Sequence, residues 1–192
     1  MEYVINPIFG ALNLAMVELF TQAGDAGRGI YSMVIAAGTA FDLGGPVNKA
    51  AGSVALGLNG MSETFDLIAR ELGIVIPPIG VGIAALLDGR FRPRVFSNEE
   101  QTVGKTSLML GLIGISEGTI PFILKNPKMI LGAIIGTQVA VLLDVWQSLP
   151  LPAVWGWFLS SDPVSYTLSV LVGSLFIAIA LLFCSKPVES HA

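Results

Sequence analysis

The sequence predicts an all-α integral membrane protein, a polytopic bundle in which two helical hairpins are broken by polar residues. Of the 192 residues, 53% are hydrophobic and 12% are charged, whereas soluble domains carry about 25% charged residues. The mean hydropathy is +0.75, and several charges gather at glycine- and proline-rich breaks between apolar segments. A soluble domain would need a charged shell, and a net charge of −4 offers no basic surface for nucleic acid.

The apolar segments differ in length, and most are too short for a plain spanning helix. Residues 163–185 contain no charge, and they are long enough to cross a bilayer core of about 30 Å, which takes roughly 20 residues. The other charge-free runs are shorter and cover residues 3–17, 72–87, 106–116 and 129–143. We therefore expect one membrane domain over residues 1–192 in which several helices are short or interrupted.

The first elements follow from their local patterns. Residues 3–22 predict a helix that carries a few polar side chains on an apolar sequence. The stretch 24–29, GDAGRG, is rich in glycine and charge and predicts a turn. Farther along, residues 63–72 predict an amphipathic helix or linker at the membrane surface, because their apolar residues recur at helical spacing. The segment 72–87 is expected to be interrupted at its proline pair.

The longest polar loop, residues 88–101, predicts the orientation of the chain. Its basic cluster consists of Arg90, Arg92 and Arg94. Because positive charge favours the cytoplasmic side, we expect this loop in the cytoplasm. Ser97 and Glu100 are spaced as a capping box and predict the start of a helix. At the opposite interface we expect an aromatic belt, after which the last span returns to the cytoplasm. The belt consists of Trp155, Trp157 and Phe158.

The first break, residues 42–49 (DLGGPVNK), places polar side chains between two charge-free arms. Its glycine pair allows a tight reversal, and the proline after it suits the start of a helix. Asn48 and Lys49 then fall in the first turn, where a cation opposes the helix dipole by a few tenths to about 1 kcal/mol. In a low dielectric such a cation needs a carboxylate partner, and Asp42 and Glu117 are the candidates.

The second break, residues 116–121 (SEGTIP), repeats this design. Glu117 lies between a serine and a glycine, with a proline close behind, and the apolar arms on either side are too short to span. Non-helical backbone at membrane depth needs protein or a water-filled cavity to satisfy its polar groups. Segments broken in this way are a strong sequence indicator of a transporter's binding site.

Two interpretations of the breaks remain open. In the first, both breaks are tips of re-entrant hairpins that face a polar solute. A carboxylate would accept hydrogen bonds from hydroxyl groups, while asparagine and lysine would donate them, which suits a sugar. In the second, the first break is an exposed loop between two short spans, and Lys49 reaches a lipid headgroup. The residues alone predict no more than a site for a polar solute.

Both breaks resemble the signature stretches of a known family. AFDLGGPVNKAA (residues 40–51) and GISEGTIPF (residues 114–122) resemble the membrane (IIC) component of bacterial phosphotransferase-system (PTS) sugar permeases. The fructose branch, which includes mannosylglycerate permeases, is the most similar. The segments PPIGVGIAALL and FSNEEQTVGK fit the same branch. The likeness covers most of residues 28–130.

The resemblance implies a fold like the transport domain of IIC permeases, with the two breaks facing the sugar. Glu117 would bind sugar hydroxyls, Asn48 and Lys49 would act from the other break, and Asp42 would support them. The complete set of implied substrate-binding residues is Glu117, Asn48, Lys49, Asp42, Ser116, Gly45 and Gly118.

The resemblance also implies partners. A IIB component, supplied with phosphate through IIA, would phosphorylate a fructose-like sugar at the inner membrane of a bacterium, where the chain would cross the lipid bilayer several times. Family members are longer, so we expect this chain to be the C-terminal, substrate-binding part, without upstream scaffold helices or IIA and IIB domains. With that scaffold present, a homodimer is expected.

Several functions are excluded, and two alternatives stay open. Cys184 is the only cysteine and His191 the only histidine, which excludes an internal disulfide, a cysteine-rich or histidine-based metal site and a His-based catalytic triad. We expect no phosphorylated His or Cys site, no catalytic residue, no metal and no cofactor, so the chain is at most the permease part of a sugar phosphotransferase. The alternatives are an ion-coupled secondary sugar transporter, with Glu117 as its proton or cation site, and a degenerate half-permease that does not transport.

Overall fold

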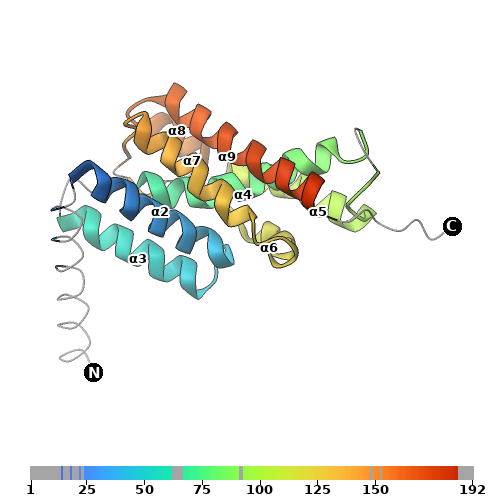
Figure 1. Cartoon of the computed structure of the whole chain (residues 1–192), viewed down its shortest axis with the longest axis horizontal. Coiled ribbons are helices and arrows are strands. Elements are labelled where there is room, and N and C mark those ends of the chain that lie inside the picture. Colours follow the sequence, from blue (N-terminus) through green and yellow to red (C-terminus); the bar gives the residue numbers. More distant parts are fainter. Residues whose placement is uncertain are drawn as a thin grey trace.

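The computed structural model describes residues 24–61, 67–90, 93–147, 149–151 and 153–185, together with Leu14, Glu18 and Gln22. This described part contains helices and no strand (Figure 1). The expected helix 3–22 lies outside it except for the three single residues, which are helical. In chain order the elements are α2 (Gly24–Asp42), α3 (Pro46–Met61), α4 (Ile68–Leu87), α5 (Asn98–Leu112), η1 (Glu117–Thr119), α6 (Ile120–Lys125), α7 (Met129–Leu142), α8 (Ala153–Leu159) and α9 (Pro163–Cys184).

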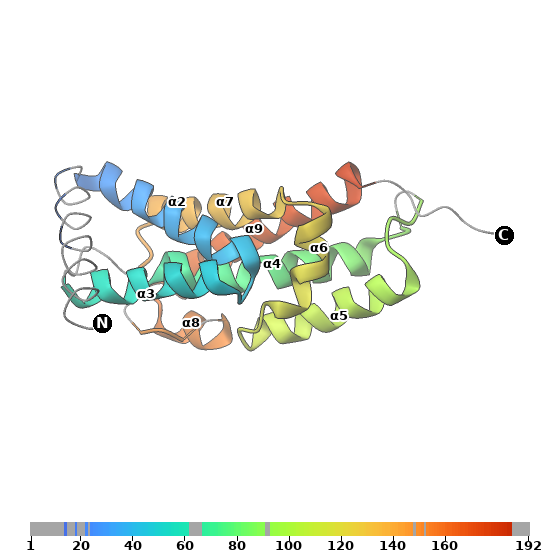
Figure 2. The same ribbon diagram turned by 90° about the horizontal axis from the view of Figure 1, so that it is seen from below.

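Helices α4 and α9 are long and apolar enough to cross a membrane. They contain 20 and 22 residues, which corresponds to about 30 and 33 Å at 1.5 Å per residue. The carboxylate of Asp162 caps α9 by accepting a hydrogen bond from the N–H of Val164, and Pro163 suits the first helical position. Both helices pack against each other and against α7, and α4 lies at the centre of the molecule (Figure 2).

Helix α9 is apolar on both of its faces. One face, which includes Ile177 and Leu181, is buried against α4 and α7. The other exposes a stripe of large apolar side chains at every third or fourth position: Val164, Leu168, Leu171, Leu175, Ile179 and Phe183. A helix that is apolar all round is typical of a membrane span. The fold therefore supports the membrane protein that the composition predicts.

The proline pair does not interrupt α4, so the predicted break in segment 72–87 is wrong. The helix runs through Pro77 and Pro78 and is buried along most of its length. Each proline removes one backbone hydrogen bond at a cost of about 3 kcal/mol. Contacts with α2, α5, α7 and α9 surround the helix, and this packing outweighs the local preference. Its first turns are also buried, so residues 68–72 are not a surface helix; residues 62–66 lie outside the described part.

The predicted turn at residues 24–29 is also wrong, because α2 begins at Gly24. Arg28, within this stretch, is buried. Its guanidinium donates to Asp144 Oδ1 (2.6 Å) and to the carbonyl of Val145 (2.7 Å), and it lies 4.0 Å from the ring centre of Trp146. These contacts join the start of α2 to the segment that follows α7, and they offset the weak helix preference of the glycines.

Two hairpins enter the molecule from opposite ends (Figure 2). The first hairpin is α2 and α3 with the first break between them, and the second hairpin is α5, η1 and α6 with the second break. The first hairpin packs on the first half of α4 and the second on its middle. Thr39 of α2 packs against Gly73, where an added methyl group would lie 2.9 Å from the threonine Cβ. Gly111 of α5 packs equally closely against Pro78, with 2.8 Å to its Cγ.

The second hairpin begins at the predicted capping box, which is confirmed. Ser97 Oγ accepts a hydrogen bond from the N–H of Glu100 (3.1 Å), and Glu100 Oε2 accepts one from the N–H of Ser97 (2.9 Å). The loop before this cap and the end of α9 lie at the same end of the molecule (Figure 2). The segment between α7 and α8 lies at the start of α4, because the N–H of Leu67 donates to the carbonyl of Gln147.

Candidate functional site

Asp42 holds the two arms of the first hairpin together. It is the last residue of α2, and its carboxylate accepts hydrogen bonds from the backbone N–H groups of Val47 (2.8 Å) and Asn48 (2.9 Å). These groups belong to the first turn of α3, where helical N–H groups have no partner within the helix. Asp42 therefore caps α3, and both of its oxygens are used for that purpose.

The reversal after Asp42 requires an unusual backbone. Leu43 has φ +47° and Gly44 has φ +113°. Glycine adopts positive φ freely, whereas a branched side chain such as leucine pays for it. Leu43 is held in place because its side chain is fully buried in the main core cluster. Gly44, the next residue, has no side chain that could collide with the residue packed on the turn.

Asn48 and Lys49 differ in how they are held. The amide of Asn48 donates to the carbonyl of Thr39 (2.6 Å) and so ties the start of α3 to the end of α2. Lys49 is exposed, and among the described residues its ammonium pairs with neither Asp42 nor Glu117, the two expected partners. Asp42 faces backbone amides instead. Among the described residues, the exposed ammonium of Lys49 therefore has no carboxylate partner.

The second break positions Glu117 at the start of a single 3₁₀ turn. Helix α5 ends at Leu112, and Gly114 (φ +84°) reverses the chain. Ser116 is buried, and its carbonyl accepts a hydrogen bond from the N–H of Thr119 (3.0 Å), which closes the turn. Gly118 lies against α5, where an added methyl group would lie 2.9 Å from Ser107 Oγ. The side chain of Glu117 itself is exposed.

The two breaks meet at Glu117 and Gly44. A methyl group added to Gly44 would lie 2.7 Å from Glu117 Oε1 and 2.9 Å from its Cγ, so the glutamate side chain lies directly on the glycine. Residues separated by more than 70 positions in the sequence are thereby brought into contact. A cavity of about 300 Å³ lies between the end of α2, with Phe41 and Asp42, and the apolar side chains of α6, and neither Gly44 nor Glu117 lines it.

The sequence predicted Gly45 as a site residue, but Gly44 is the glycine that contacts Glu117. Gly45 instead makes room for the carboxylate of Asp42, which a methyl group there would overlap. Two adjacent glycines give no local signal for which of them faces the other hairpin. Sequence reasoning also missed Glu71, which is fully buried in α4 and pairs with Arg70. Its position among apolar residues gives no indication of a partner.

Curated relatives match nearly all of the chain. The Fructose-like permease IIC component of Shigella flexneri is 40% identical over 189 residues, which are 95% of this chain and 45% of the relative. The Fructose permease IIC component of Bacillus amyloliquefaciens is 29% identical over 193 residues, 98% of this chain and 62% of the relative. The PTS system fructose-specific EIIABC component of Bacillus subtilis (strain 168) is 28% identical over 193 residues, 98% of this chain and 30% of the relative.

These matches complete the assignment that the fold began. No family model matches the chain, and no solved structure matches it significantly. The all-helical fold and its two long apolar helices are consistent with a helical membrane protein. Within that class, nearly the whole chain is similar to part of the fructose-type PTS IIC permeases. It spans less than half the length of the Shigella relative.

Proposed function

We propose that the chain is the sugar-binding, transport-domain part of a fructose-type PTS permease and that its substrate is a fructose-like sugar. The observation that carries this proposal is the contact between Glu117 and Gly44, which joins the two breaks. A carboxylate between two broken hairpins at membrane depth is a costly feature that function explains better than stability does.

The groups around this contact have complementary hydrogen-bonding roles. The carboxylate of Glu117 is exposed and accepts hydrogen bonds from sugar hydroxyls, while the ammonium of Lys49 donates up to three. Asn48 has one amide hydrogen and its oxygen left after donating to Thr39. Asp42 acts as a support because its oxygens cap α3. Ser116, Gly45 and Gly118 complete the site by shaping the two breaks.

The membrane placement extends this proposal. The two hairpins are re-entrant, entering from opposite surfaces and meeting near mid-membrane, and α4 and α9 cross the bilayer fully. The chain is a multi-pass protein of the bacterial inner membrane. The loop that contains Arg90 and Arg94 lies in the cytoplasm, in agreement with the preference of basic residues for that side.

Phosphoryl transfer requires other components. The name of the Bacillus subtilis relative joins A, B and C in one component, and we propose that this chain works with separate IIA and IIB components that phosphorylate the sugar on the cytoplasmic side. The remaining length of the relatives supplies further helices, through which a full-length permease forms a homodimer. Uptake of fructose into vesicles that contain neither partner proteins nor phosphoenolpyruvate would overturn the coupling to a phosphotransferase.

The direct test of the site is Glu117→Gln, which keeps the shape of the side chain and removes its charge. Hydrogen bonds to a charged group contribute about 1.5–3 kcal/mol, so fructose affinity should fall roughly tenfold or more. Binding of labelled fructose to the purified chain in detergent measures this, and thermal unfolding verifies that the variant folds. Glu99→Gln is the matched control, because Glu99 is an exposed glutamate in the first turn of α5. Equal binding by Glu117→Gln and Glu99→Gln would refute the site.

A further inference from the structure

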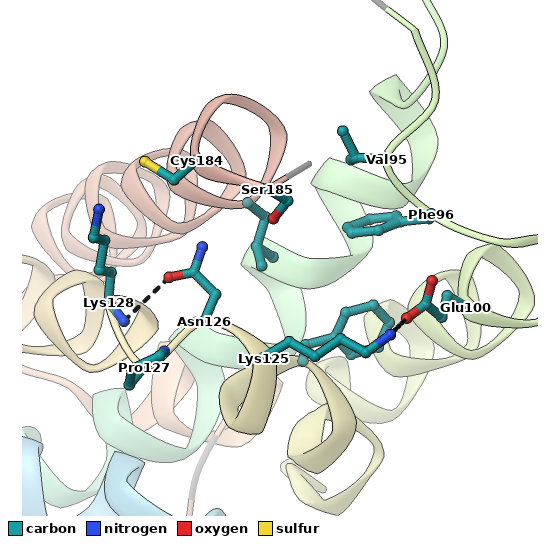
Figure 3. A pocket seen from close by; sticks show the side chains of 11 residues that line it. Val95, Phe96, Glu100, Lys125, Asn126, Pro127, Lys128, Cys184 and Ser185 are labelled. Atoms are coloured by element: carbon teal, nitrogen blue, oxygen red, sulfur yellow. Dashed lines mark hydrogen bonds and ion pairs between the residues drawn. The ribbon is translucent and has the colours of Figure 1, made fainter. Parts of the chain in front are cut away.

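A second cavity lies at the end of the molecule where the basic loop and the end of α9 meet. It has a volume of about 550 Å³ and is enclosed by the start of α5, the end of α6 and the end of α9. Figure 3 shows its lining, with Lys128 and Asn126 on one side, Lys125 and Glu100 below, and Phe96 and Val95 opposite. The contact between the two breaks is not part of this lining.

The cations of this cavity exceed its anions. Lys125 forms an ion pair with Glu100. Lys128 is exposed, and no carboxylate of the described residues pairs with it. Lys128 also directly precedes the first turn of α7, where the positive end of the helix dipole adds to its charge. The lining therefore presents one lysine without an acidic partner and a second that shares its charge with a single glutamate.

The opposite wall of the cavity is apolar. Phe96 and Phe122 pack edge to face, with ring centres 5.3 Å apart, and Val95 and Leu181 continue the surface. Asn126 fixes the polar side, because its buried amide donates to the carbonyl of Ala180 and its oxygen accepts from the N–H of Lys128. Lys125 and Lys128 flank Asn126 with their ammonium groups turned apart (Figure 3), and the aromatic and aliphatic groups line the opposite wall. Two exposed lysines on either side of Asn126, facing an apolar wall, suit a ligand that is anionic at one end and apolar at the other.

We propose that this cavity binds an anionic phospholipid of the inner leaflet, with its phosphate at Lys125 and Lys128 and the beginning of an acyl chain along Phe96 and Phe122. Basic pockets between helices on the cytoplasmic side suit anionic headgroups. The proposal rests on the membrane orientation given above and not on sugar binding at Glu117. Free phosphate would gain nothing from the apolar wall, which is why the wall favours a lipid.

The test compares lipid binding by four variants whose expected effects differ in sign. Native mass spectrometry of the purified chain measures retained phosphatidylglycerol against phosphatidylcholine. Lys125→Gln and Lys128→Gln should each lower the affinity for phosphatidylglycerol about fivefold, as expected for one cation at a charged membrane surface. Glu100→Gln keeps the capping box, since glutamine serves there equally, and it frees Lys125, so binding should stay equal or increase. Lys105→Gln, an exposed lysine elsewhere on α5, should change nothing.

The opposite effects expected for Lys125→Gln and Glu100→Gln distinguish an electrostatic role of these residues from a structural one. Lys125→Gln and Glu100→Gln break the same ion pair, so a purely structural role predicts that both weaken lipid binding, and that result would overturn the proposal. So would equal retention of phosphatidylcholine and phosphatidylglycerol by the unmodified chain. Glycerol phosphate is the third arm: displacement of the lipid by glycerol phosphate at equal concentration would assign the site to a soluble anion instead. Fructose binding by the lysine variants reports separately on the sugar site.

Discussion

At the scale of single residues, the proposed site depends on a glycine that lets a carboxylate approach. Glu117 lies on Gly44, and the positive φ of Gly44 forms the reversal that brings the two hairpins into contact. The sequence predicted that the polar residues of both breaks belong to a site, because a polar residue in an apolar segment is costly in a membrane and can be recognised locally. It could not predict which glycine touches Glu117, or that Asp42 caps α3 instead of pairing with Lys49, because both facts depend on the three-dimensional reversal.

Gly44→Ala should therefore weaken both the fold and the site. Alanine at φ +113° is strained, and its methyl group would lie 2.7 Å from Glu117 Oε1. We expect a loss of at least about 1 kcal/mol in the free energy of unfolding together with lower fructose affinity. Thermal unfolding in detergent and labelled-fructose binding measure the two effects.

Gly60→Ala is the matched control for this change. Gly60 is an exposed residue of α3, and a methyl group there meets nothing within 4 Å. Alanine at such a helical position stabilises by up to about 1 kcal/mol. If Gly44→Ala and Gly60→Ala behave alike, the close contact between the breaks does not exist in solution.

At the scale of elements, an ion pair closes the base of the second hairpin. Lys125 at the end of α6 pairs with Glu100 in the first turn of α5. The capping box at Ser97 was predictable because its partners lie three residues apart, whereas the ion pair joins residues 25 positions apart. Two of the wrong predictions, the turn at residues 24–29 and the break in segment 72–87, have the same origin. Arg28 is held by Asp144, 116 residues away, and α4 continues through its prolines because four other helices pack around it.

The ion pair predicts how stability depends on pH. Burial raises the pKa of Glu100, but the hydrogen bonds from Lys125 and from the N–H of Ser97 together lower it by more. The pKa of Glu100 therefore lies below its ordinary value of 4.5. A carboxyl group with a lowered pKa stabilises the fold above its unfolded pKa, and this contribution is lost as the pH falls through the folded pKa. Between about pH 5 and pH 3, the unfolding temperature of the unmodified chain should fall more steeply than that of Glu100→Gln. Parallel curves for the two proteins would contradict the role of this carboxylate.

At the scale of the whole molecule, the two hairpins and the two long helices define two ends. The loop after α4 and the end of α9 share one end (Figure 2), while the segment between α7 and α8 lies at the start of α4. Composition alone predicted a membrane protein, because that property is a sum over all residues. How the hairpins meet could not be predicted in the same way, since it depends on contacts between segments far apart in the sequence.

The orientation is testable with the single cysteine. Cys184 is exposed at the end of α9, so a membrane-impermeant maleimide should label it in inside-out vesicles and not in right-side-out vesicles. In a Cys184→Ser background, Leu149→Cys should show the reverse pattern, because Leu149 is exposed in the segment between α7 and α8. Labelling of both positions from one side would contradict the orientation. Cys184→Ser alone should abolish labelling and leave fructose binding unchanged.

The uninterrupted course of α4 has a mechanical consequence. Pro77 and Pro78 have no N–H to offer, so the carbonyls of Gly73 and Ile74, four residues earlier, have no helical donor in the middle of this span. The helix can bend at that point without breaking a backbone hydrogen bond. Both hairpins pack close to this point, the first on Gly73 and the second on Pro78. A bend of α4 at this point would therefore shift the two breaks relative to each other, and with them the proposed sugar site.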